Sequence, residues 1–214
     1  MSSDPAGASI CCELDAAESE LHRKGLGPIC GVDEAGRGPL AGPVVVAAVV
    51  LSHRRRVAGV RDSKKLSPAS REELAAEIRV SALEYAIVAV DHEEIDRLNI
   101  LTATLEGMRR AVESLDLRPA LVLVDGNRLP KFEAEAGEEW RAVVKGDDRF
   151  ASIAAASILA KVERDHIMVQ LDRRYPGYGF AGHKGYPTVQ HRRALSEMGP
   201  CPVHRRSFRL DYRS

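Results

Sequence analysis

Acidic residues follow three apolar runs of this sequence, and their placement is the first indication of chemistry. Asp33 and Glu34 come after PICGV, Asp125 comes after ALVLV, and Asp147 and Asp148 end the segment VVKGDD. An acid within an apolar strand is costly unless it is paired or bound to a metal ion. Turn formation or helix capping would explain any one of these acids. Acids at three strand ends together favour a metal site.

The type of ligand indicates which metal such a site would bind. Carboxylates alone suit hard, oxygen-seeking cations, so we expect Mg²⁺ or Mn²⁺. The four cysteines do not have the spacing of zinc ligands. Two divalent ions about 4 Å apart, held by several carboxylates, form a clamp for in-line phosphoryl chemistry. The acids therefore predict a two-metal centre that acts on phosphate esters.

A glycine-rich segment, GRGPLAG, follows the acid pair and suits close backbone approach to a ligand. Neighbouring residues on a regular strand point to opposite faces of the sheet. Asp33 and Glu34 can reach one site only if the strand ends or bulges beside them. We therefore predict a distorted backbone over residues 34–38.

Apolar periodicity and turn signals predict alternating strands and helices after an initial hairpin. The strands are expected at 28–36, 43–52, 83–91, 120–127 and 140–148. The helices are expected at 68–81, 93–115, from about 150 to 175, and at 188–199, with N-caps at Ser67 and Thr188 and a C-cap at Gly199. This order predicts an α/β fold with a mixed sheet flanked by helices, whose site lies at strand ends. We divide the chain into a polar leader (1–24), a catalytic core (25–175) and a C-terminal substrate-contacting segment (176–214) of the same folding unit.

The charge is balanced overall but uneven along the chain. Residues 150–214 contain eleven Lys and Arg against five Asp and Glu, while the whole chain has a formal net charge of zero. A basic C-terminal third suits a local phosphate-contact surface, although a solvated charged face explains it equally well. No apolar stretch reaches the roughly 18 residues that span a bilayer, and residues 1–20 lack a signal-peptide pattern. We expect a cytoplasmic protein, monomeric and without membrane contact.

Eight motifs resemble those of the type 2 ribonucleases H, the bacterial ribonuclease HII family, and they run in family order from about residue 28 to 208. The matching stretches are GVDEAGRGPLAGPV (31–44), DSKKLS (62–67), EIDRLNILTATL (94–105), VDGN (124–127), VVKGD (143–147), AASILAKVERD (155–165), HKGY (183–186) and HRRSF (204–208). The series is far more specific than any one motif alone.

The resemblance implies a ribonuclease H-like fold with a C-terminal helical extension. It implies an endonuclease that cleaves the RNA strand of RNA–DNA hybrids and incises duplex DNA 5′ of embedded ribonucleotides. The family's four catalytic, metal-binding carboxylates fall on Asp33, Glu34, Asp125 and Asp147, which would hold two Mn²⁺ or Mg²⁺ ions. Water would attack in line at phosphorus and leave 5′-phosphate and 3′-hydroxyl ends. Asp148 has no catalytic counterpart, so we expect it to cap the following helix.

The resemblance also implies how the substrate is recognised. Gly36, Arg37 and Gly38 match the element that reads the 2′-hydroxyl through backbone contacts, and this hydroxyl is what separates RNA from DNA. Tyr186 matches the tyrosine that stacks on the sugar after the ribonucleotide, although its sequence context alone suggests a surface tyrosine. Further candidates for phosphate or substrate contact are Lys145, Ser157, Lys161, His183, Lys184 and Arg205. An i,i+4 salt bridge to Asp165 is the competing interpretation for Lys161. The arginines at 54–56 could contact DNA, but such a run is more often a solvated loop.

Two other functions fit parts of the pattern. A resolvase is a two-metal nuclease on the same fold, but it has no need of a ribose-reading loop or of Tyr186. A non-catalytic hybrid-binding module has no need of four acids. The expected partners are RNA–DNA hybrid and ribonucleotide-containing duplex DNA, in replication and in ribonucleotide excision repair. A replication clamp is a possible further partner that the sequence does not reveal.

Overall fold

A computed structural model of the chain describes residues 14, 16–52, 57, 59–60, 66–131 and 137–210. The strands are β1 (Ile29–Ala35), β2 (Val44–Val50), β3 (Glu84–Val90), β4 (Leu121–Asp125) and β5 (Glu139–Val143). The helices are α2 (Pro68–Ser81), α3 (His92–Leu98), α4 (Ile100–Glu113), the short 3-10 helix η2 (Gly146–Asp148), α5 (Ala151–Arg174), α6 (Phe180–His183) and α7 (Val189–Met198). Residues 54–56 and 61–65, which the sequence places in polar loops, lie outside the described residues.

The five strands form one mixed sheet in the order β3-β2-β1-β4-β5. β1 pairs antiparallel with β2, and β2 with β3, while β1–β4 and β4–β5 are parallel. The expected hairpin and mixed sheet are confirmed. Because β1 and β4 are parallel neighbours, their carboxyl ends lie at the same edge of the sheet.

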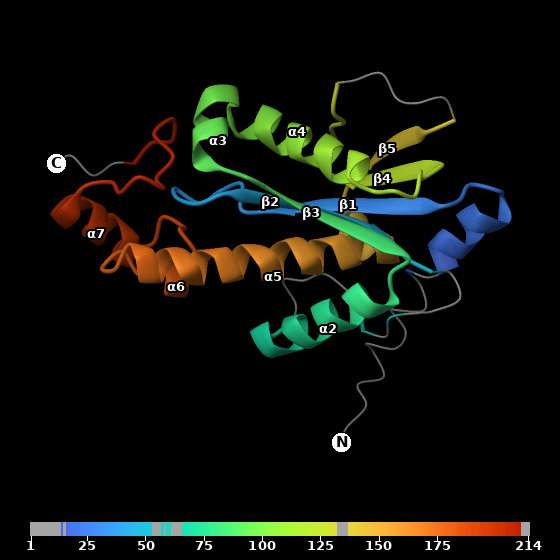
Figure 1. Ribbon diagram of the computed structural model, residues 1–214, viewed down its shortest axis with the longest axis horizontal. Helices are drawn as coiled ribbons and strands as arrows, with labels where there is room; N and C mark the ends of the chain where they lie inside the picture. The colour runs from blue at the N-terminus through green and yellow to red at the C-terminus, as the bar shows by residue number, and fades with distance from the viewer. Residues whose placement is uncertain are drawn as a thin grey trace.

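Helices cover both faces of this sheet, with α3 and α4 on one side and α2 and α5 on the other (Figure 1). β2 is apolar throughout because each of its faces is buried. Its odd-numbered residues pack in one core with α2 and α5, and its even-numbered residues, from Val46 on, pack against α4; the first set is Val45, Ala47 and Val49, and the second is Val46, Ala48 and Val50. Side chains alternate between the two faces of a strand, so each residue of the neighbouring strand β1 likewise faces either the α5 layer or the α4 layer.

The sequence predicted one helix over 93–115, and that prediction is wrong in one respect. Asn99 has a φ of +68° and separates α3 from α4. Its side-chain oxygen accepts hydrogen bonds from the backbone N–H groups of Leu101 and Thr102, so it caps the second helix. The other predicted caps, at Ser67, Thr188 and Gly199, are confirmed.

The strand predicted over 140–148 ends earlier than expected. β5 stops at Val143, Lys145 takes a left-handed conformation with φ +55°, and Asp147 and Asp148 lie in η2. The expected cap by Asp148 is also wrong, since Phe150 is the N-cap residue of α5 and makes no side-chain capping bond.

The start of α5 is instead held by the helix of residues 16–23. Glu18 Oε1 accepts hydrogen bonds from the backbone N–H of Ser152 at 2.6 Å and from its hydroxyl at 2.5 Å. Both residues are buried. Part of the predicted leader thus anchors the helix that lies beneath β1.

The C-terminal segment returns to the loop that follows β1. Ala41 forms an antiparallel bridge with His204, and the N–H of Gly42 donates to the carbonyl of Val203. Phe180, Leu195 and Met168 belong to the core cluster that joins this segment to α5. The division into three regions stays a prediction. Within the described residues no helix is both long and apolar enough to cross a membrane.

Candidate active site

Three of the four predicted carboxylates lie on the α5 side of the sheet edge where β1 and β4 end. Asp33 pairs in register with Ala47, whose side chain packs with α5, and Asp125 is the last residue of β4. Asp147 lies in η2, immediately before α5. The backbone N–H of Gly146 donates to Asp125 Oδ1 at 2.7 Å, which joins η2 to the end of β4. Segments far apart in sequence therefore bring these acids to one edge.

Asp33 is the most strongly perturbed of these acids. Its side chain is 6% exposed, and Oδ1 accepts the backbone N–H of Glu34 at 2.7 Å. Ser157, on α5, also hydrogen-bonds its carboxylate. Burial raises the pKa of Asp33 well above its usual range, and the negative charges of Glu34 and Asp125 raise it further. Asp33 thus lies close enough to two other carboxylates to be repelled by both.

Glu34 occupies the opposite face, as strand geometry requires. It lines a cavity of about 130 Å³ together with Arg37, Thr104 and Asn127, and Asp125 reaches the same cavity because it stands at the very end of β4. Arg37 Nη1 lies 3.2 Å from Glu34 Oε1, while Oε2 is buried without a hydrogen-bond partner. Burial raises the pKa of Glu34, and the nearby Arg37 opposes that rise. The free oxygen is an unsatisfied acceptor at the edge of the site.

The predicted distortion of residues 34–38 is present only beyond the acid pair. β1 keeps regular pairing through Ala35, and the turn comes at Gly36, whose φ is +98°. Asp33 and Glu34 therefore approach the edge from two faces rather than through a bulge. As the side chains stand, the described parts of the chain contain no group of three or more His, Cys, Asp or Glu residues arranged to hold an ion.

The residues nevertheless fit a hard divalent cation. Every candidate ligand is a carboxylate, which is the donor that Mg²⁺ and Mn²⁺ prefer. The repulsion on Asp33 and the unpartnered oxygen of Glu34 are both relieved by a positive charge between them. The assignment of Asp33, Glu34, Asp125 and Asp147 as metal ligands stays a prediction.

Two buried arginines fix the Gly36–Gly38 loop beside the acids. Arg205 donates to the carbonyl oxygens of Gly36 at 2.7 Å, Arg37 at 2.9 Å and Gly42 at 2.9 Å. Arg164, on α5, donates to the carbonyls of Pro43 at 3.1 Å and Lys184 at 3.0 Å. Both side chains are 0% exposed. Their guanidinium groups hold the two loops as a unit.

Tyr186 lies directly against this loop. A β-carbon added to Gly38 would lie 3.5 Å from Tyr186 Cε1, so the ring and the glycine are in contact range. The ring remains 44% exposed and accessible to a ligand. The structure thus brings together the two elements predicted to read the sugars on either side of the scissile step.

The remaining predicted substrate residues fall into different surroundings. Lys145 is exposed beside Asp147, and Ser157 contacts Asp33. Lys161 forms an ion pair with Asp165 at 2.6 Å, which is the competing interaction foreseen from their spacing. Lys184 donates to the backbone carbonyl of Ala181.

Two of the weaker candidates are engaged in backbone contacts, Arg205 fully buried and His183 half-buried. Arg205 is enclosed as described above, so its predicted contact with phosphate is wrong for this conformation. His183 Nε2 lies 2.7 Å from the carbonyl oxygen of Tyr178, and its Nδ1 accepts from Gly185. Both side chains therefore bond to the backbone of the loops that carry the other candidates.

Sequence reasoning missed the role of Arg164. The buried stripe of α5 runs through Ile153, Ser157, Ala160, Arg164 and Met168, at spacings of three and four residues. A charged residue in a stripe that otherwise faces the core needs buried partners. The charge of Arg164 at a core-facing position was the signal available in the sequence. Its partners in the structure are the backbone carbonyls of Pro43 and Lys184.

Comparisons with known proteins show the family to which the chain belongs. The family model described as Ribonuclease HII matches residues 30–211. A Ribonuclease HII of Verminephrobacter eiseniae is 59% identical over 194 residues, which cover 91% of this chain and 90% of that protein.

Solved structures show the same fold. The crystal structure of ribonuclease H2 from Pyrococcus horikoshii has a TM-score of 0.72 and 30% identity, covering 85% of this chain and 94% of that one. The RNase HII of Archaeoglobus fulgidus, solved in a PCNA:RNase HII complex, has a TM-score of 0.66 and 32% identity, covering 83% and 92%. From its motifs, its sheet order and these matches, this chain belongs to the ribonuclease HII family and is a hydrolase of the ribonuclease H class.

Proposed function

We propose that this chain hydrolyses the RNA strand of RNA–DNA hybrids and incises duplex DNA 5′ of embedded ribonucleotides. One observation carries the proposal: carboxylates and the Gly36–Gly38 loop, which we expect to read the ribose, meet at one sheet edge. Asp33 and Asp125 lie at the ends of parallel neighbouring strands, and the Gly36–Gly38 loop beside them is packed against Tyr186. The family's name and its relatives' names support action on RNA–DNA hybrids.

Two divalent cations, Mg²⁺ or Mn²⁺, would be held by Asp33, Glu34, Asp125 and Asp147. When bound, they would supply activation of the attacking water and stabilisation of the leaving 3′-oxygen, so that cleavage leaves 5′-phosphate and 3′-hydroxyl ends. The carboxylates act as ligands and none is required as a covalent nucleophile.

The chain's own groups prepare the carboxylates for this task. Ser157 holds the Asp33 carboxylate from the α5 side, and the N–H of Gly146 holds Asp125. Each bond leaves further lone pairs of the carboxylate available to a cation. Arg37 pairs with one oxygen of Glu34 and leaves the other free. Lys145 is exposed beside Asp147 and would contact a phosphate of the bound strand.

Recognition of the ribonucleotide falls to the loop and the tyrosine. Backbone groups of Gly36, Arg37 and Gly38 would contact the 2′-hydroxyl, since the absence of side chains at two of these positions lets the sugar approach. The ring of Tyr186 would pack on the following deoxyribose. Ser157, Lys161 and Lys184 remain further candidates for contact with the substrate.

The test uses a labelled DNA duplex that contains one ribonucleotide, incubated with the protein and either Mg²⁺ or Mn²⁺. The Asp33→Asn variant and an all-DNA duplex are the controls. We expect a metal-dependent nick on the 5′ side of the ribonucleotide with the native protein alone. Cleavage of the all-DNA duplex would favour a resolvase. Hybrid binding without any cleavage would overturn the proposal in favour of a binding module.

We also propose a protein partner. The Archaeoglobus fulgidus relative is solved in a complex with PCNA. We extend this to a replication clamp as partner of the present chain, which otherwise acts as a monomer. Size-exclusion chromatography with the clamp of the same cell would show a joint peak, and separate elution at micromolar concentrations would refute it.

A further inference from the structure

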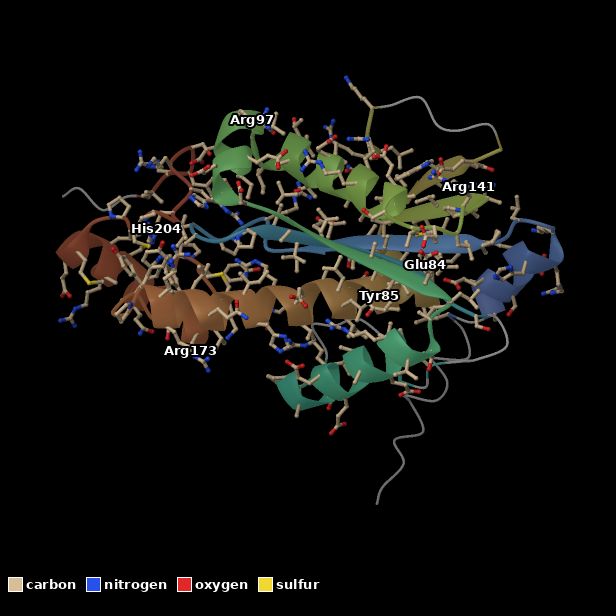
Figure 2. The ribbon with its side chains drawn as sticks, viewed as in Figure 1. Glu84, Tyr85, Arg97, Arg141, Arg173 and His204 are labelled. Atoms are coloured by element: carbon tan, nitrogen blue, oxygen red, sulfur yellow. The ribbon has the colours of Figure 1, made fainter. Side chains whose placement is uncertain are left out.

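The loop that carries Tyr186 rests on three histidines that the proposed chemistry does not use. They come from α6, α7 and the C-terminal segment, and Figure 2 places His204 at the same end of the molecule as α7. His191 is 0% exposed and His204 is 1% exposed. His183 stacks on His191 with ring centroids 4.5 Å apart, and Phe180 meets His191 edge-on at 5.5 Å. The rings of His191 and His204 are therefore fully enclosed, while His183 is half-buried.

Hydrogen bonds link the rings of His204 and His191 into one continuous line, which runs from the backbone of Cys201 to the backbone of Tyr186. The backbone nitrogen of Cys201 lies 3.0 Å from His204 Nδ1. His204 Nε2 lies 3.0 Å from His191 Nε2, and His191 Nδ1 lies 3.0 Å from the carbonyl oxygen of Tyr186. The line therefore ends on the residue whose ring contacts the Gly36–Gly38 loop.

The two ends of the line determine where its protons lie. A backbone N–H only donates, so Cys201 requires a bare Nδ1 on His204, and neutral His204 then carries its proton on Nε2. A carbonyl only accepts, so Tyr186 requires a proton on His191 Nδ1, which leaves His191 Nε2 free to accept. Both ends give the same answer: a single proton lies between the two Nε2 atoms, and the rings have opposite tautomers.

A competing contact exists at one end. The carbonyl oxygen of Cys201 lies 3.2 Å from His204 Nδ1. A proton on that nitrogen would leave two bare Nε2 atoms facing each other, unless one ring became charged. The same carbonyl already accepts the backbone N–H of His204 at 3.1 Å, so it needs no second donor.

We propose that His191 and His204 are positioning residues for Tyr186, which hold its backbone through two neutral imidazoles of opposite tautomer and so set the ring against Gly38. This inference rests on the proposed function, because it assigns the pair to the step in which Tyr186 selects the sugar after the ribonucleotide. The N–H of Thr188 donates to the same carbonyl at 2.8 Å, so Tyr186 is held from two directions.

The surroundings of the pair favour uncharged rings. Burial lowers the pKa of His204 from its ordinary 6.5 to about 4, and burial also lowers the pKa of His191. The interactions described around the pair involve no carboxylate; the titratable groups in them are His92, His183, Tyr178, Arg192 and Cys201. A second proton on either ring would remove a nitrogen that accepts a hydrogen bond in this line. None of these groups is a carboxylic acid that would stabilise the resulting positive charge.

The direct test is long-range ¹H–¹⁵N correlation spectroscopy of the native protein's imidazoles at neutral pH, with single-histidine variants for assignment. We expect a proton on Nδ1 of His191 and on Nε2 of His204. A proton on Nδ1 of His204, or a charged form of either ring at neutral pH, would overturn the proposal. This readout does not depend on any catalytic activity.

The functional test compares His204→Gln with His204→Met, side chains of similar size. The glutamine amide can still donate to His191 and the thioether cannot. Selectivity is measured as the ratio of kcat/KM for a deoxyribose against a ribose following the cleaved position. We expect His204→Met to lose about tenfold in this ratio, as for one lost hydrogen bond, and His204→Gln to restore most of it.

His166→Gln is the matched control, because His166 is half exposed and pairs with Glu72 on the surface. Its selectivity should equal that of the native protein. Equal selectivity in folded His204→Met and native protein would overturn the positioning role. If the native protein does not cleave at ribonucleotides at all, the proposed function fails, while the tautomer measurement still decides the arrangement of the pair.

Discussion

A β-carbon added to Gly36 would lie 1.8 Å from Nε of Arg164, and Gly36 has a φ of +98°. Arg164 cannot move aside freely, because it is buried and bonded to the carbonyls of Pro43 and Lys184. Gly36→Ala should therefore combine backbone strain with a clash. We expect the free energy of unfolding to fall by roughly 2–4 kcal/mol, measured by urea denaturation, together with loss of cleavage.

Gly38→Ala is the matched control for this loop. Its β-carbon would lie 3.5 Å from Tyr186 Cε1, an ordinary van der Waals distance, and the position has no left-handed φ. This variant should remain within about 1 kcal/mol of the native stability. Similar destabilisation of both variants would show that Arg164 does not confine the loop as described.

The buried position of Arg205 separates it from residues that touch phosphate. Each phosphate contact contributes about one unit to the slope of log affinity against log salt. Arg205 bonds the carbonyls of Gly36, Arg37 and Gly42, so Arg205→Lys should impair cleavage and leave the salt slope unchanged. Lys145→Ala should reduce the slope by about one unit. Fluorescence anisotropy of a labelled hybrid over a salt series measures both.

The comparison between the salt slopes of Arg205→Lys and Lys145→Ala decides whether Arg205 touches the substrate. A reduced salt slope in Arg205→Lys would mean that the arginine leaves its buried position and contacts the substrate. Arg193→Lys is a suitable control, since Arg193 is exposed and pairs only with Glu197 on its own helix among the interactions described.

Much of the fold could be predicted because local signals and tertiary packing agree. β2 is apolar at every position, which is typical of a strand covered on both faces, and Ser67 and Thr188 cap helices as their sequence context indicates. The break at Asn99 escaped prediction because apolar periodicity continues across it. Its left-handed conformation is stabilised by the capping bonds of its own side chain.

The sequence could predict that the candidate acids lie at or near strand ends, but not the faces that they occupy. Asp33 and Glu34 were expected to reach one site where the strand ends or bulges, and the strand end is what the structure shows: pairing is regular through Ala35 and the turn comes at Gly36. The supports of the site were less accessible to sequence analysis. Arg164, Arg205 and Glu18 bond to backbone groups more than 100 residues away in sequence, so no local pattern identifies their partners.

Asp33→Asn should separate function from stability. Burial and the charges of Glu34 and Asp125 disfavour ionised Asp33 when no cation is present. Asparagine removes that charge at nearly constant volume. We expect the variant to lose metal-dependent cleavage and, in EDTA at pH 8, to be more stable than the native protein by roughly 1–2 kcal/mol. Thermal unfolding of both proteins measures the difference.

A divalent cation should make the native protein the more stable of the two. Added Mn²⁺ should raise the Tm of the native protein and have a much smaller effect on Asp33→Asn, because the ligand set is incomplete in the variant. Equal Tm increases in both proteins would contradict the assignment of Asp33 as a ligand.

Glu18 gives the segment before β1 a role in holding the active site. Its carboxylate accepts both donors of Ser152, in the first turn of α5, and Ser157 lies only five residues further along that helix. Glu18→Ala leaves a buried N–H and hydroxyl without this acceptor, so we expect a loss of about 1–3 kcal/mol in stability. Glu20→Ala is the control, because Glu20 is more exposed and pairs with Arg23 and Lys24 at the surface. Hydrogen exchange at the Ser152 amide should accelerate in the first variant and stay unchanged in the second. Unchanged exchange in Glu18→Ala would show that α5 begins independently of the preceding segment.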